Sequence, residues 1–384
     1  MIIKHKKAEE KQQRVIYGKV CSIVGICLNL LLFAVKYLIG TVSASIAIVA
    51  DGFNNLSDAA SSIITLTGFW LGSRRADSEH PFGHGRMEYI SSLGVSFFVL
   101  LMGFELLKSS IGKLIHPSEI IVSKSLLLAL GLSILVKLYM ASYNSHIGKK
   151  IGSTALKATA FDSLSDCLST LVVLLSVGVF RLWRINVDGW AGVLVSVFIL
   201  VGGFNMLKET VSPLLGELPD PALVERIREI VIQRDGILDI HDMIIHDYGP
   251  DRKMVSLHAE VDGSGNIFDL HDVIDGAEQD LMNELGMLAI IHMDPVRTDD
   301  DTRTKCKEEM KQLLSGIDER LSLHDFRLRE DSGVTCMKFD LVIPEKYETP
   351  TDELREQVLK EASERWPDYR IEMQIELSYV GVKQ

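Results

Sequence analysis

The chain has few cysteines, no excess of basic residues and no apolar segment at its N-terminus. Its five cysteines, spread over 384 residues, form no C-x-x-C pair, so neither a disulfide framework nor a thiolate zinc site is expected. A formal charge of -12 argues against a nucleic-acid partner, because binding phosphates requires a basic face. The opening stretch MIIKHKKAEEKQQR is polar for too long to be a secretory signal.

Apolar residues, in contrast, are abundant and unevenly distributed. They make up 47% of the chain, and the mean hydropathy of +0.18 is too high for a soluble protein of this length. Crossing a bilayer of about 30 Å takes roughly 20 helical residues. Six stretches meet that length, which predicts an α-helical membrane domain in contact with the lipid bilayer: 17–40, 44–72, 88–112, 120–145, 152–180 and 187–209.

The connections between these spans differ in their content of Lys and Arg. Positive residues favour the cytoplasmic side of a membrane, and six spans put both termini on one side. We therefore expect both termini in the cytoplasm. The absence of an organellar targeting segment favours the plasma membrane of a bacterium. Lys and Arg are frequent in 1–16, 73–88 and 145–157 and sparse in 40–46, 110–124 and 181–189.

After about residue 213 the composition becomes that of soluble domains. The stretch 221–295 has the pattern helix, strand, strand, helix, strand, and 303–380 repeats it. LDIHDMII in the first copy and LSLHDFRL in the second indicate an internal duplication of an open-faced α+β sandwich. The predicted division is a cytoplasmic tail 1–16, a six-helix membrane domain 17–212, a first α+β domain 213–297 and a second, degenerate copy 303–384.

Two of the predicted spans carry side chains that a membrane disfavours. An ionisable group near the bilayer centre costs at least about 2.5 to 3.5 kcal/mol, so such groups need a partner or a cavity. Asn54 and Asp58 in the second span are spaced i, i+4, as are Asp162 and Asp166 in the fifth. Each pair lies on one helix face, and both reach the same depth, about 15 to 21 Å from opposite surfaces.

Four oxygen donors at one level form a cage that a divalent cation can neutralise. The alternative is that the acids pair with Lys36 or Lys137, which we place near the cytoplasmic ends of their spans, where lysine can snorkel to water. Asp51 is an additional candidate ligand, with a helix cap or a supporting contact as the alternative roles.

At this point the sequence resembles a known family, the cation diffusion facilitators. VADGFNNLSD is similar to the family's second-helix signature and AFDSLSD to its fifth-helix signature, and the resemblance covers about 12–297. It implies a proton-coupled exporter of divalent metals, with six membrane helices and a cytoplasmic ferredoxin-like domain. The implied ligands of the transported ion are Asn54, Asp58, Asp162 and Asp166.

The donor set departs from that of the zinc-transporting members, which usually carry histidine in one or both pairs. Imidazole favours zinc and copper, whereas carboxylate and amide oxygens suit manganese and magnesium. We therefore predict Mn²⁺ as the substrate, with protons as the counter-ion. Export of Zn²⁺, Fe²⁺ or Cd²⁺ is the alternative within the family.

The loop after the second span contains a second candidate metal site. Asp77, His80 and His84 have the spacing i, i+3, i+7, which brings one carboxylate and two imidazoles together if the loop is tightly turned. Pro81 and Gly83 argue against a regular helix there. The resemblance implies metal ligands at these three positions. A polar loop without metal is the alternative.

The first soluble domain carries a third candidate site. Five imidazole or carboxylate groups fall at strand ends or at a helix start, which is more than chance placement suggests. The resemblance implies a cytoplasmic metal site that bridges two protomers, hence a homodimer, with Zn²⁺ among its candidate ions. The residues are His241, His258, His271, His292 and Asp294.

The second copy retains only part of this pattern. His324 corresponds to His241, whereas Asp340 stands where His258 stood and Glu376 lies near the level of His292. We therefore predict that the second copy has lost metal binding.

Two other functions use the same residues differently. In an intramembrane aspartyl protease, two buried aspartates share a proton as an acid and base pair. The sequence lacks a GxGD segment, which argues against that enzyme class. In a channel or a metal sensor, the soluble domains act alone, and Asp58, Asp162 and Asp166 (the midplane acids) are not needed for function.

Overall fold

The computed structural model describes residues 2–42, 46–115, 124–183, 187–250, 252–298, 300–331, 333–344 and 347–379. Two compact units divide the chain, Met1–Glu217 with Asp247–Arg252 and Leu218–His246 with Lys253–Gln384. The connections 43–45, 116–123 and 184–186 lie outside the described residues.

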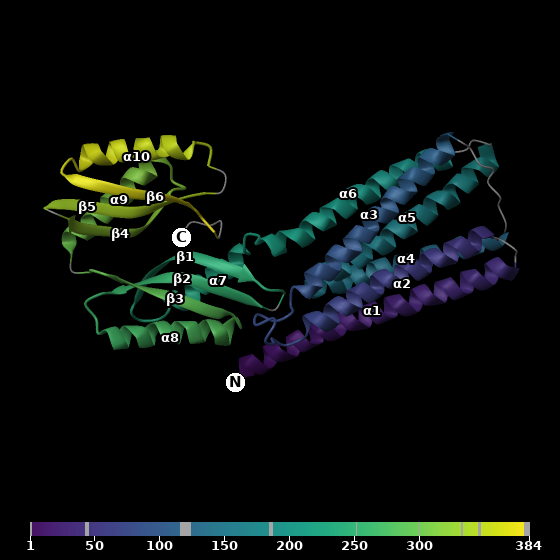
Figure 1. The fold of residues 1–384 in the computed structure, drawn as a ribbon, viewed down its shortest axis with the longest axis horizontal. Helices are drawn as coiled ribbons and strands as arrows, with labels where there is room; N and C mark the ends of the chain where they lie inside the picture. Colours follow the sequence, from purple (N-terminus) through teal and green to yellow (C-terminus); the bar gives the residue numbers. More distant parts are fainter. Residues whose placement is uncertain are drawn as a thin grey trace. The chain divides into compact units, whose positions relative to one another are not determined.

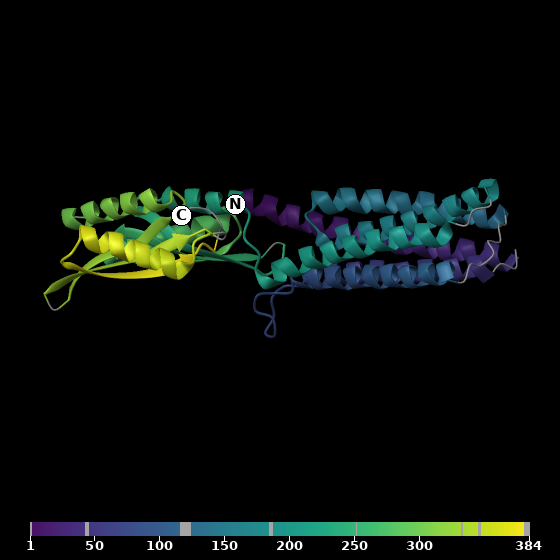
Figure 2. The same cartoon turned by 90° about the horizontal axis from the view of Figure 1, so that it is seen from above.

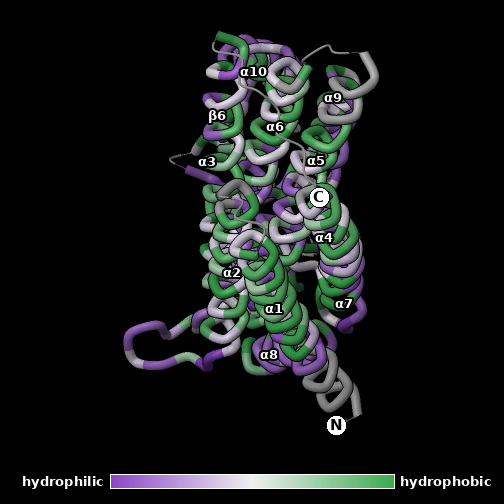
Figure 3. Tube along the Cα trace, turned by 90° about the vertical axis from the view of Figure 1, so that its right-hand side faces the viewer, coloured by the Kyte–Doolittle hydropathy of each residue, from purple (hydrophilic) through white to green (hydrophobic). Residues whose placement is uncertain are grey.

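The first unit is an elongated bundle of helices that lie side by side (Figures 1 and 2). Five of its described helices are long and apolar enough to cross a membrane, and hydrophobic residues predominate along the tube of α1 (Figure 3). The remaining helix, α2, has its apolar run interrupted by the predicted polar positions. The six are α1 (Ile2–Val42), α2 (Ile46–Gly72), α3 (Met87–Ile115), α4 (Lys124–Lys150), α5 (Thr154–Trp183) and α6 (Asp188–Leu215).

Two helix ends differ from the predicted spans. The structure continues α1 back to Ile2, so the polar residues predicted as a tail belong to this helix. It also extends α6 through Pro213 to Leu215, and Gly216 ends the helix in a left-handed conformation at φ 91°. Hydropathy locates only the apolar part of each helix and does not indicate whether the helix continues into polar residues.

The helices of the bundle pack in pairs: α1 along α2, α3 along α6 and α4 along α5. Hydroxyl groups tie helices together where lipid offers no partner. Thr65 and Thr159 form a buried hydrogen bond of 2.9 Å between α2 and α5, and Ser92 and Thr210 form one of 3.0 Å between α3 and α6. Small polar side chains thus hold the interior of the bundle.

The second unit contains two three-stranded sheets, of which the first follows the predicted order of helix, strand, strand, helix, strand. The strand order is β1-β2-β3, with β2 and β3 parallel and joined by a helix. Val, Ile and Leu side chains from both helices and from the strands form one core. The elements are α7 (Pro221–Ile232), β1 (Ile237–Asp247), β2 (Lys253–Asp262), α8 (Ile267–Glu284) and β3 (Leu288–Val296).

The second sheet repeats this topology. Its order is β4-β5-β6, with β4 and β5 antiparallel and β5 and β6 parallel, over a core of its own. The predicted fold class, a helical membrane domain followed by a duplicated ferredoxin-like domain, is confirmed. The elements are α9 (Asp301–Ile317), β4 (Ser322–Asp331), β5 (Val334–Ile343), α10 (Thr351–Arg365) and β6 (Tyr369–Leu377).

The two copies share one unusual backbone feature. Asp242 in β1 and Asp325 in β4 are the two described non-glycine residues with positive φ, 51° and 49°. Aspartate tolerates this left-handed conformation better than most residues. Each follows a histidine, His241 and His324, so the strained position preserves the same local geometry in both copies.

Candidate metal centres

Three carboxylates meet inside the helical bundle. Asp58 comes from α2, and Asp162 and Asp166 come from successive turns of α5. One oxygen of each lies within 4.8 Å of an oxygen of the other two, and Asp58 and Asp162 are buried. Carboxylates this close repel one another, so the arrangement favours a cation between them.

A lysine of α4 joins this cluster. The Nζ of Lys137 lies 2.7 Å from Oδ2 of Asp58 and 2.7 Å from Oδ2 of Asp166, and its side chain is 4% exposed. The prediction that Lys137 snorkels to a membrane surface is therefore wrong. Two acids at its own depth hold the ammonium inside the bundle more effectively than distant water does.

Lys36 of α1 makes a separate ion pair. Its Nζ lies 2.7 Å from Oδ2 of Asp51, and its side chain is also buried. Lys36 stands near the end of α1 farthest from the N-terminus, so its predicted place near the cytoplasmic end is incompatible with the predicted cytoplasmic N-terminus. Among the described residues, Asp51 is not grouped with the three-carboxylate cluster, and its charge is balanced by this lysine.

A cavity of about 500 Å³ adjoins the cluster. Asn54 lines it together with the three carboxylates, and Asn54 is exposed to it rather than buried. Several other lining residues, among them Lys36, Ser109 and Val173, lie farther along their helices toward Val42, Ile115 and Trp183. The cavity therefore extends from the carboxylates toward that end of the bundle.

On the opposite side of the cluster the helices are tightly packed. Thr65 lies about 10 Å beyond Asp58 along α2, and its hydroxyl bonds with that of Thr159, less than one turn before Asp162. Ser61 and both threonines are buried. This layer of hydroxyls closes the bundle between the carboxylates and the end that bears the N-terminus.

The loop between α2 and α3 gathers its three predicted residues. Oδ1 of Asp77 lies 3.5 Å from Nδ1 of His80, and Oδ2 lies 3.5 Å from Nε2 of His84. The loop is a series of tight turns rather than a helix, with Gly83 at φ 78°. Nδ1 of His84 is buried without a hydrogen-bond partner in the described structure, which leaves this nitrogen available to a ligand.

Backbone groups hold the carboxylate of this loop in place. The amides of His80 and Glu79 donate hydrogen bonds of 2.7 and 3.1 Å to Oδ1 of Asp77. These bonds, the one from His80 first, hold the pKa of Asp77 below its usual range. Asp77 is thus kept as an anion that faces two imidazoles.

In the first sheet, three of the five predicted residues, all histidines, surround the carboxylate of a fourth, Asp294. Oδ2 of Asp294 lies 3.0 Å from Nδ1 of His258 and 3.2 Å from Nε2 of His241, and its Oδ1 lies 3.2 Å from Nε2 of His292. Nε2 of His241 is buried and lacks hydrogen-bond geometry. The side chains form two overlapping groups that could hold an ion, one of His258, His292 and Asp294 and one of His241, Asp242 and His258. Each combines two imidazoles with a carboxylate, donors that fit Zn²⁺.

The fifth predicted residue, His271, stands apart. It lies exposed on α8 and is not among the metal-binding groups found in the described part of the chain. Asp242, which sequence reasoning did not single out, lies closer, with Oδ2 3.9 Å from Nδ1 of His258 and 4.0 Å from Nε2 of His241. Its signal in the sequence is the repeated His-Asp pair.

Pairing of the acids with Lys137 is the alternative to a cation site that the sequence leaves open, and the structure forms that pair. The signal was present, because an ionisable residue inside an apolar span is by default a functional candidate with a partner to be named. Lys137 lies within an apolar stretch of α4, and its depth matches that of the acids on α2 and α5. This match in depth favours the pairing over snorkelling to a membrane surface.

Comparisons with known proteins agree with this architecture. Residues 22–215 match the model of the cation efflux transmembrane domain, and residues 219–296 match that of the cation efflux protein cytoplasmic domain. Both matches end before the second ferredoxin-like copy begins.

Curated relatives extend over most of the same region. An uncharacterized transporter of Methanocaldococcus jannaschii is 32% identical over 282 residues, which is 72% of this chain and 97% of that protein. The manganese efflux system protein MneP of Bacillus subtilis is 26% identical, over 75% of this chain and 98% of its own. The cation-efflux pump FieF of Salmonella paratyphi A is 25% identical, over 73% and 94%. The chain therefore belongs to the cation efflux family, the cation diffusion facilitators, whose members are transporters and not enzymes.

Proposed function

We propose that this protein exports a divalent cation, Mn²⁺ by preference, from the cytoplasm in exchange for protons. The observation that carries the proposal is the buried cluster of Asp58, Asp162 and Asp166 beside a cavity lined by Asn54. Every one of these donors is oxygen, and oxygen donors suit Mn²⁺ better than they suit Zn²⁺. Two relatives named as manganese efflux system proteins support the choice of metal.

Charge balance supports exchange of one ion for two protons. Three carboxylates and the ammonium of Lys137 leave a formal charge of minus two in the cluster. One divalent cation neutralises that charge, and so do two protons. Because a bound metal and bound protons compete for the same oxygens, loading with one releases the other.

The packing around the cluster supports alternating access. The cavity reaches the carboxylates from the end of the bundle with the inter-helix connections, whereas the pair Thr65 and Thr159 closes the opposite end. With both termini in the cytoplasm, as the distribution of Lys and Arg favours, this arrangement faces outward. Loading from the cytoplasm then requires α2 and α5 to separate at the threonine layer.

The soluble part is proposed to act in assembly. We assign 17–212 to transport, 213–297 to metal binding and dimer formation, and 303–384 to a degenerate copy of that domain. The match to the cytoplasmic domain of cation efflux proteins supports a homodimer. We place this homodimer in the plasma membrane. The Asp294 cluster would hold a resident Zn²⁺, with His271 reaching it only from another protomer, and the Asp77 loop would hold a further ion.

Uptake into proteoliposomes loaded with a pH dye tests the transport proposal. Mn²⁺, Zn²⁺, Fe²⁺ and Cd²⁺ are compared at equal free concentrations for the wild type and for Asp162→Ala. We expect Mn²⁺ to move fastest, with about two protons moving per ion, and Asp162→Ala to abolish both fluxes while the dimer remains intact on size-exclusion chromatography.

Different failures of this experiment carry different meanings. A Zn²⁺ flux faster than that of Mn²⁺ would still show an exporter, but it would contradict the inference that the oxygen donors select Mn²⁺. Undiminished flux in the folded Asp162→Ala protein would overturn the midplane site. Metal flux without proton movement would overturn the exchange, and no flux of any metal in the wild type would favour a sensor.

A further inference from the structure

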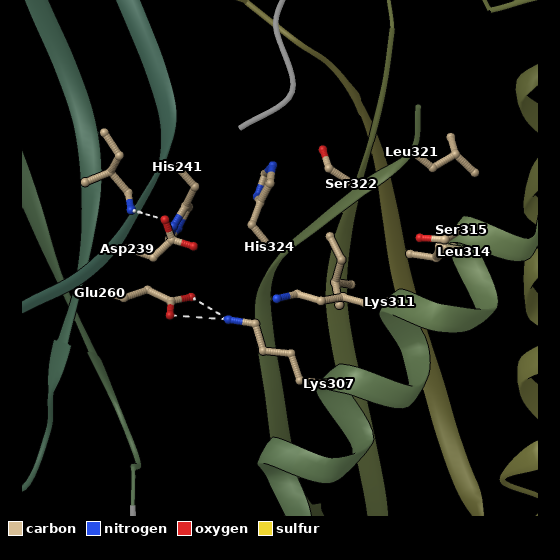
Figure 4. A pocket seen from close by; sticks show the side chains of 12 residues that line it. Asp239, His241, Glu260, Lys307, Lys311, Leu314, Ser315, Leu321, Ser322 and His324 are labelled. Carbon is tan, nitrogen blue, oxygen red and sulfur yellow. Dashed lines mark hydrogen bonds and ion pairs between the residues drawn. The ribbon is translucent and has the colours of Figure 1, made fainter. Parts of the chain in front are cut away.

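The cavity between the two ferredoxin-like copies carries charges that cancel. It has a volume of about 240 Å³, and the acidic and basic side chains that line it have partners of opposite sign. Figure 4 shows Lys307 of α9 beside Glu260 of β2, with 3.3 Å between Nζ and Oε1. The other pairs are Lys311 with Glu308 and Asp239 with Arg228. This cavity therefore does not call for a charged ligand.

A second cavity, at the end of the helical bundle that bears the N-terminus, has a different balance of charge. It measures about 490 Å³ and lies among α1, the end of α2, the start of α3 and the turn Asp247–Arg252, which belongs to the same compact unit. Four basic side chains and one acid of the described residues line this basic cavity, so its formal charge is plus three. They are Arg14, Lys19, Arg75, Arg252 and Glu88.

The acid of the basic cavity is already paired. Nη2 of Arg14 lies 2.8 Å from both carboxylate oxygens of Glu88. Nε of Arg14 donates a hydrogen bond of 2.9 Å to the carbonyl oxygen of Ile151, which fixes the guanidinium in place. This ion pair forms a neutral part of the wall, so the excess positive charge belongs to the other three side chains.

Those three side chains have no counter-charge in the described structure. Arg252 donates hydrogen bonds of 3.0 and 3.5 Å to the carbonyl oxygens of Phe82 and Arg74, which carry no formal charge. Lys19 and Arg75 make no hydrogen bond or ion pair with any described residue. Cations that converge on one cavity create a positive potential there, which attracts an anion.

Aromatic side chains place the basic cavity at the surface of the membrane. Trp70, the neighbour of the lining residue Phe69 in α2, is exposed, and Cζ of Arg74 lies 4.3 Å from the centroid of its ring. In α1, the ring centroid of Tyr17 lies 4.8 Å from Nζ of Lys150. Tryptophan and tyrosine concentrate at the depth of the lipid headgroups. The cavity therefore lies where headgroups are available to it.

An apolar stripe of α1 begins at the same cavity. Ile16 lines the cavity and is exposed, as are Val20 and Ile23. The spacing i, i+4, i+7 puts these three side chains on one helix face. They belong to a segment of α1, Gln12–Val42, that is apolar enough to cross the membrane. The stripe thus offers acyl chains a surface that continues from the cavity.

We propose that the basic cavity binds the phosphodiester of an anionic phospholipid, with Lys19, Arg75 and Arg252 as its counter-charges. A phosphodiester shares one negative charge between two oxygens, to which arginine donates in pairs and lysine as a point charge. The volume of about 490 Å³ lies within the range of roughly 300 to 1,000 Å³ that is usual for small-molecule sites.

The surroundings of the cavity favour one kind of phosphate over the others. A zwitterionic headgroup would bring its own ammonium into the same positive field, whereas the headgroup of phosphatidylglycerol carries only the negative charge. Inorganic phosphate has the same acceptor oxygens but uses neither the headgroup depth nor the apolar stripe of α1. An anionic lipid uses all three features.

Native mass spectrometry of the full-length protein in detergent tests the proposal. Wild type, Lys19→Gln and Arg75→Gln are titrated with phosphatidylglycerol or with phosphatidylcholine. We expect the wild type to retain phosphatidylglycerol in preference to phosphatidylcholine. Each variant should bind phosphatidylglycerol about fivefold more weakly, the factor that corresponds to one Lys or Arg near an anionic surface. Lys149→Gln is the matched control, because it removes an exposed charge at the end of α4 outside the cavity, and it should bind as the wild type does.

Thermal unfolding of the same proteins separates loss of the lipid from loss of the fold. Without added lipid, the double variant Lys19→Gln/Arg75→Gln should unfold at the same temperature as the wild type. Phosphatidylglycerol should raise the unfolding temperature of the wild type and of Lys149→Gln more than that of the double variant. Inorganic phosphate at millimolar concentration should not displace the lipid.

Three outcomes overturn the proposal. The first is undiminished phosphatidylglycerol binding by the folded double variant, and the second is equal binding of phosphatidylcholine by the wild type. The third is displacement of the lipid by inorganic phosphate, which would identify free phosphate as the ligand. None of these measurements involves a metal ion, so their outcome is independent of the proposed export function.

Discussion

The three carboxylates inside the bundle (Asp58, Asp162 and Asp166, the midplane cluster) and the histidines around Asp294 (the Asp294 cluster) are both suited to a cation, but with different chemistry. In the bundle, three carboxylates are partly neutralised by an ammonium of the protein itself, Lys137. In the first sheet, the carboxylate of Asp294 is surrounded by imidazoles, and His241 retains an unsatisfied nitrogen. A transported ion has to leave its site, whereas a structural ion has to stay. The ammonium of Lys137, which competes with the ion for the same oxygens, suits release of a transported ion. Imidazole nitrogens suit retention of a structural ion.

The largest expected difference in transport is between two variants, each of which lacks one acid from one of the clusters. Asp58→Ala should lower Mn²⁺ flux in proteoliposomes by at least about a hundredfold, because it deletes a ligand of the transported ion. Asp294→Ala should lower that flux far less at equal amounts of reconstituted dimer. A similar loss of Mn²⁺ flux in both variants, with both dimers intact, would contradict the assignment of transport to one cluster and structural ion binding to the other.

Removing the tethered cation should have the opposite effect on affinity. Lys137→Met deletes the charge that competes with metal, so Mn²⁺ should bind about tenfold more tightly and the flux should fall as release slows. Isothermal titration and liposome flux measure the two quantities. Lys36→Met is the matched control, since its partner is Asp51, and it should leave the affinity near that of the wild type. Weaker binding in Lys137→Met would mean that the lysine positions the acids rather than competing.

Changing one donor in the bundle should alter selectivity more than total activity. Asn54→His adds an imidazole to an all-oxygen set, so the ratio of Zn²⁺ to Mn²⁺ flux should rise by about tenfold. Asn54→Asp is the control, because it keeps oxygen as the donor and should leave the metal preference with Mn²⁺. An unchanged ranking in the histidine variant would show that Asn54 does not set selectivity.

The smallest effect on transport is expected from the Asp294 cluster. His292→Ala should remove much of the thermal stabilisation that Zn²⁺ gives the protein, because a ligand that binds only the folded state stabilises it less as its Kd rises. Mn²⁺ flux should change by less than about twofold. Differential scanning fluorimetry with and without Zn²⁺ measures the first quantity. If Zn²⁺ stabilised His292→Ala as much as the wild type, the Zn²⁺ would be bound at a site that does not include His292.

The sequence predicts the parts of this molecule that depend on local pattern. Helical spacing brought Asp58 and Asp162 to one depth, and the repeated strand order predicted both sheets. The partner of an ion pair depends on packing instead. The sequence leaves the pairing of the acids with Lys137 as one of two alternatives, because helix direction and depth alone do not reveal that two acids face this lysine across the bundle.

The same limit applies to the second ferredoxin-like copy. Comparing letters suggested degeneration, because Asp340 replaces a histidine. The structure adds what the letters do not carry: His324 is buried, its nitrogens are orphaned, and Asp242 of the other copy stands near it. Contacts between the two copies cannot be predicted when each copy is read alone.

The position of Lys137 also bears on leakage. In the proposed exchange the carrier returns with protons instead of metal on these acids, and any acid that stays unprotonated would attract the abundant monovalent ions during that return. An ammonium fixed to α4 and held 2.7 Å from two of the acids fills that place without leaving the protein. We expect Na⁺ and K⁺ to be poor competitors here, so the membrane potential is not dissipated by idle cycling.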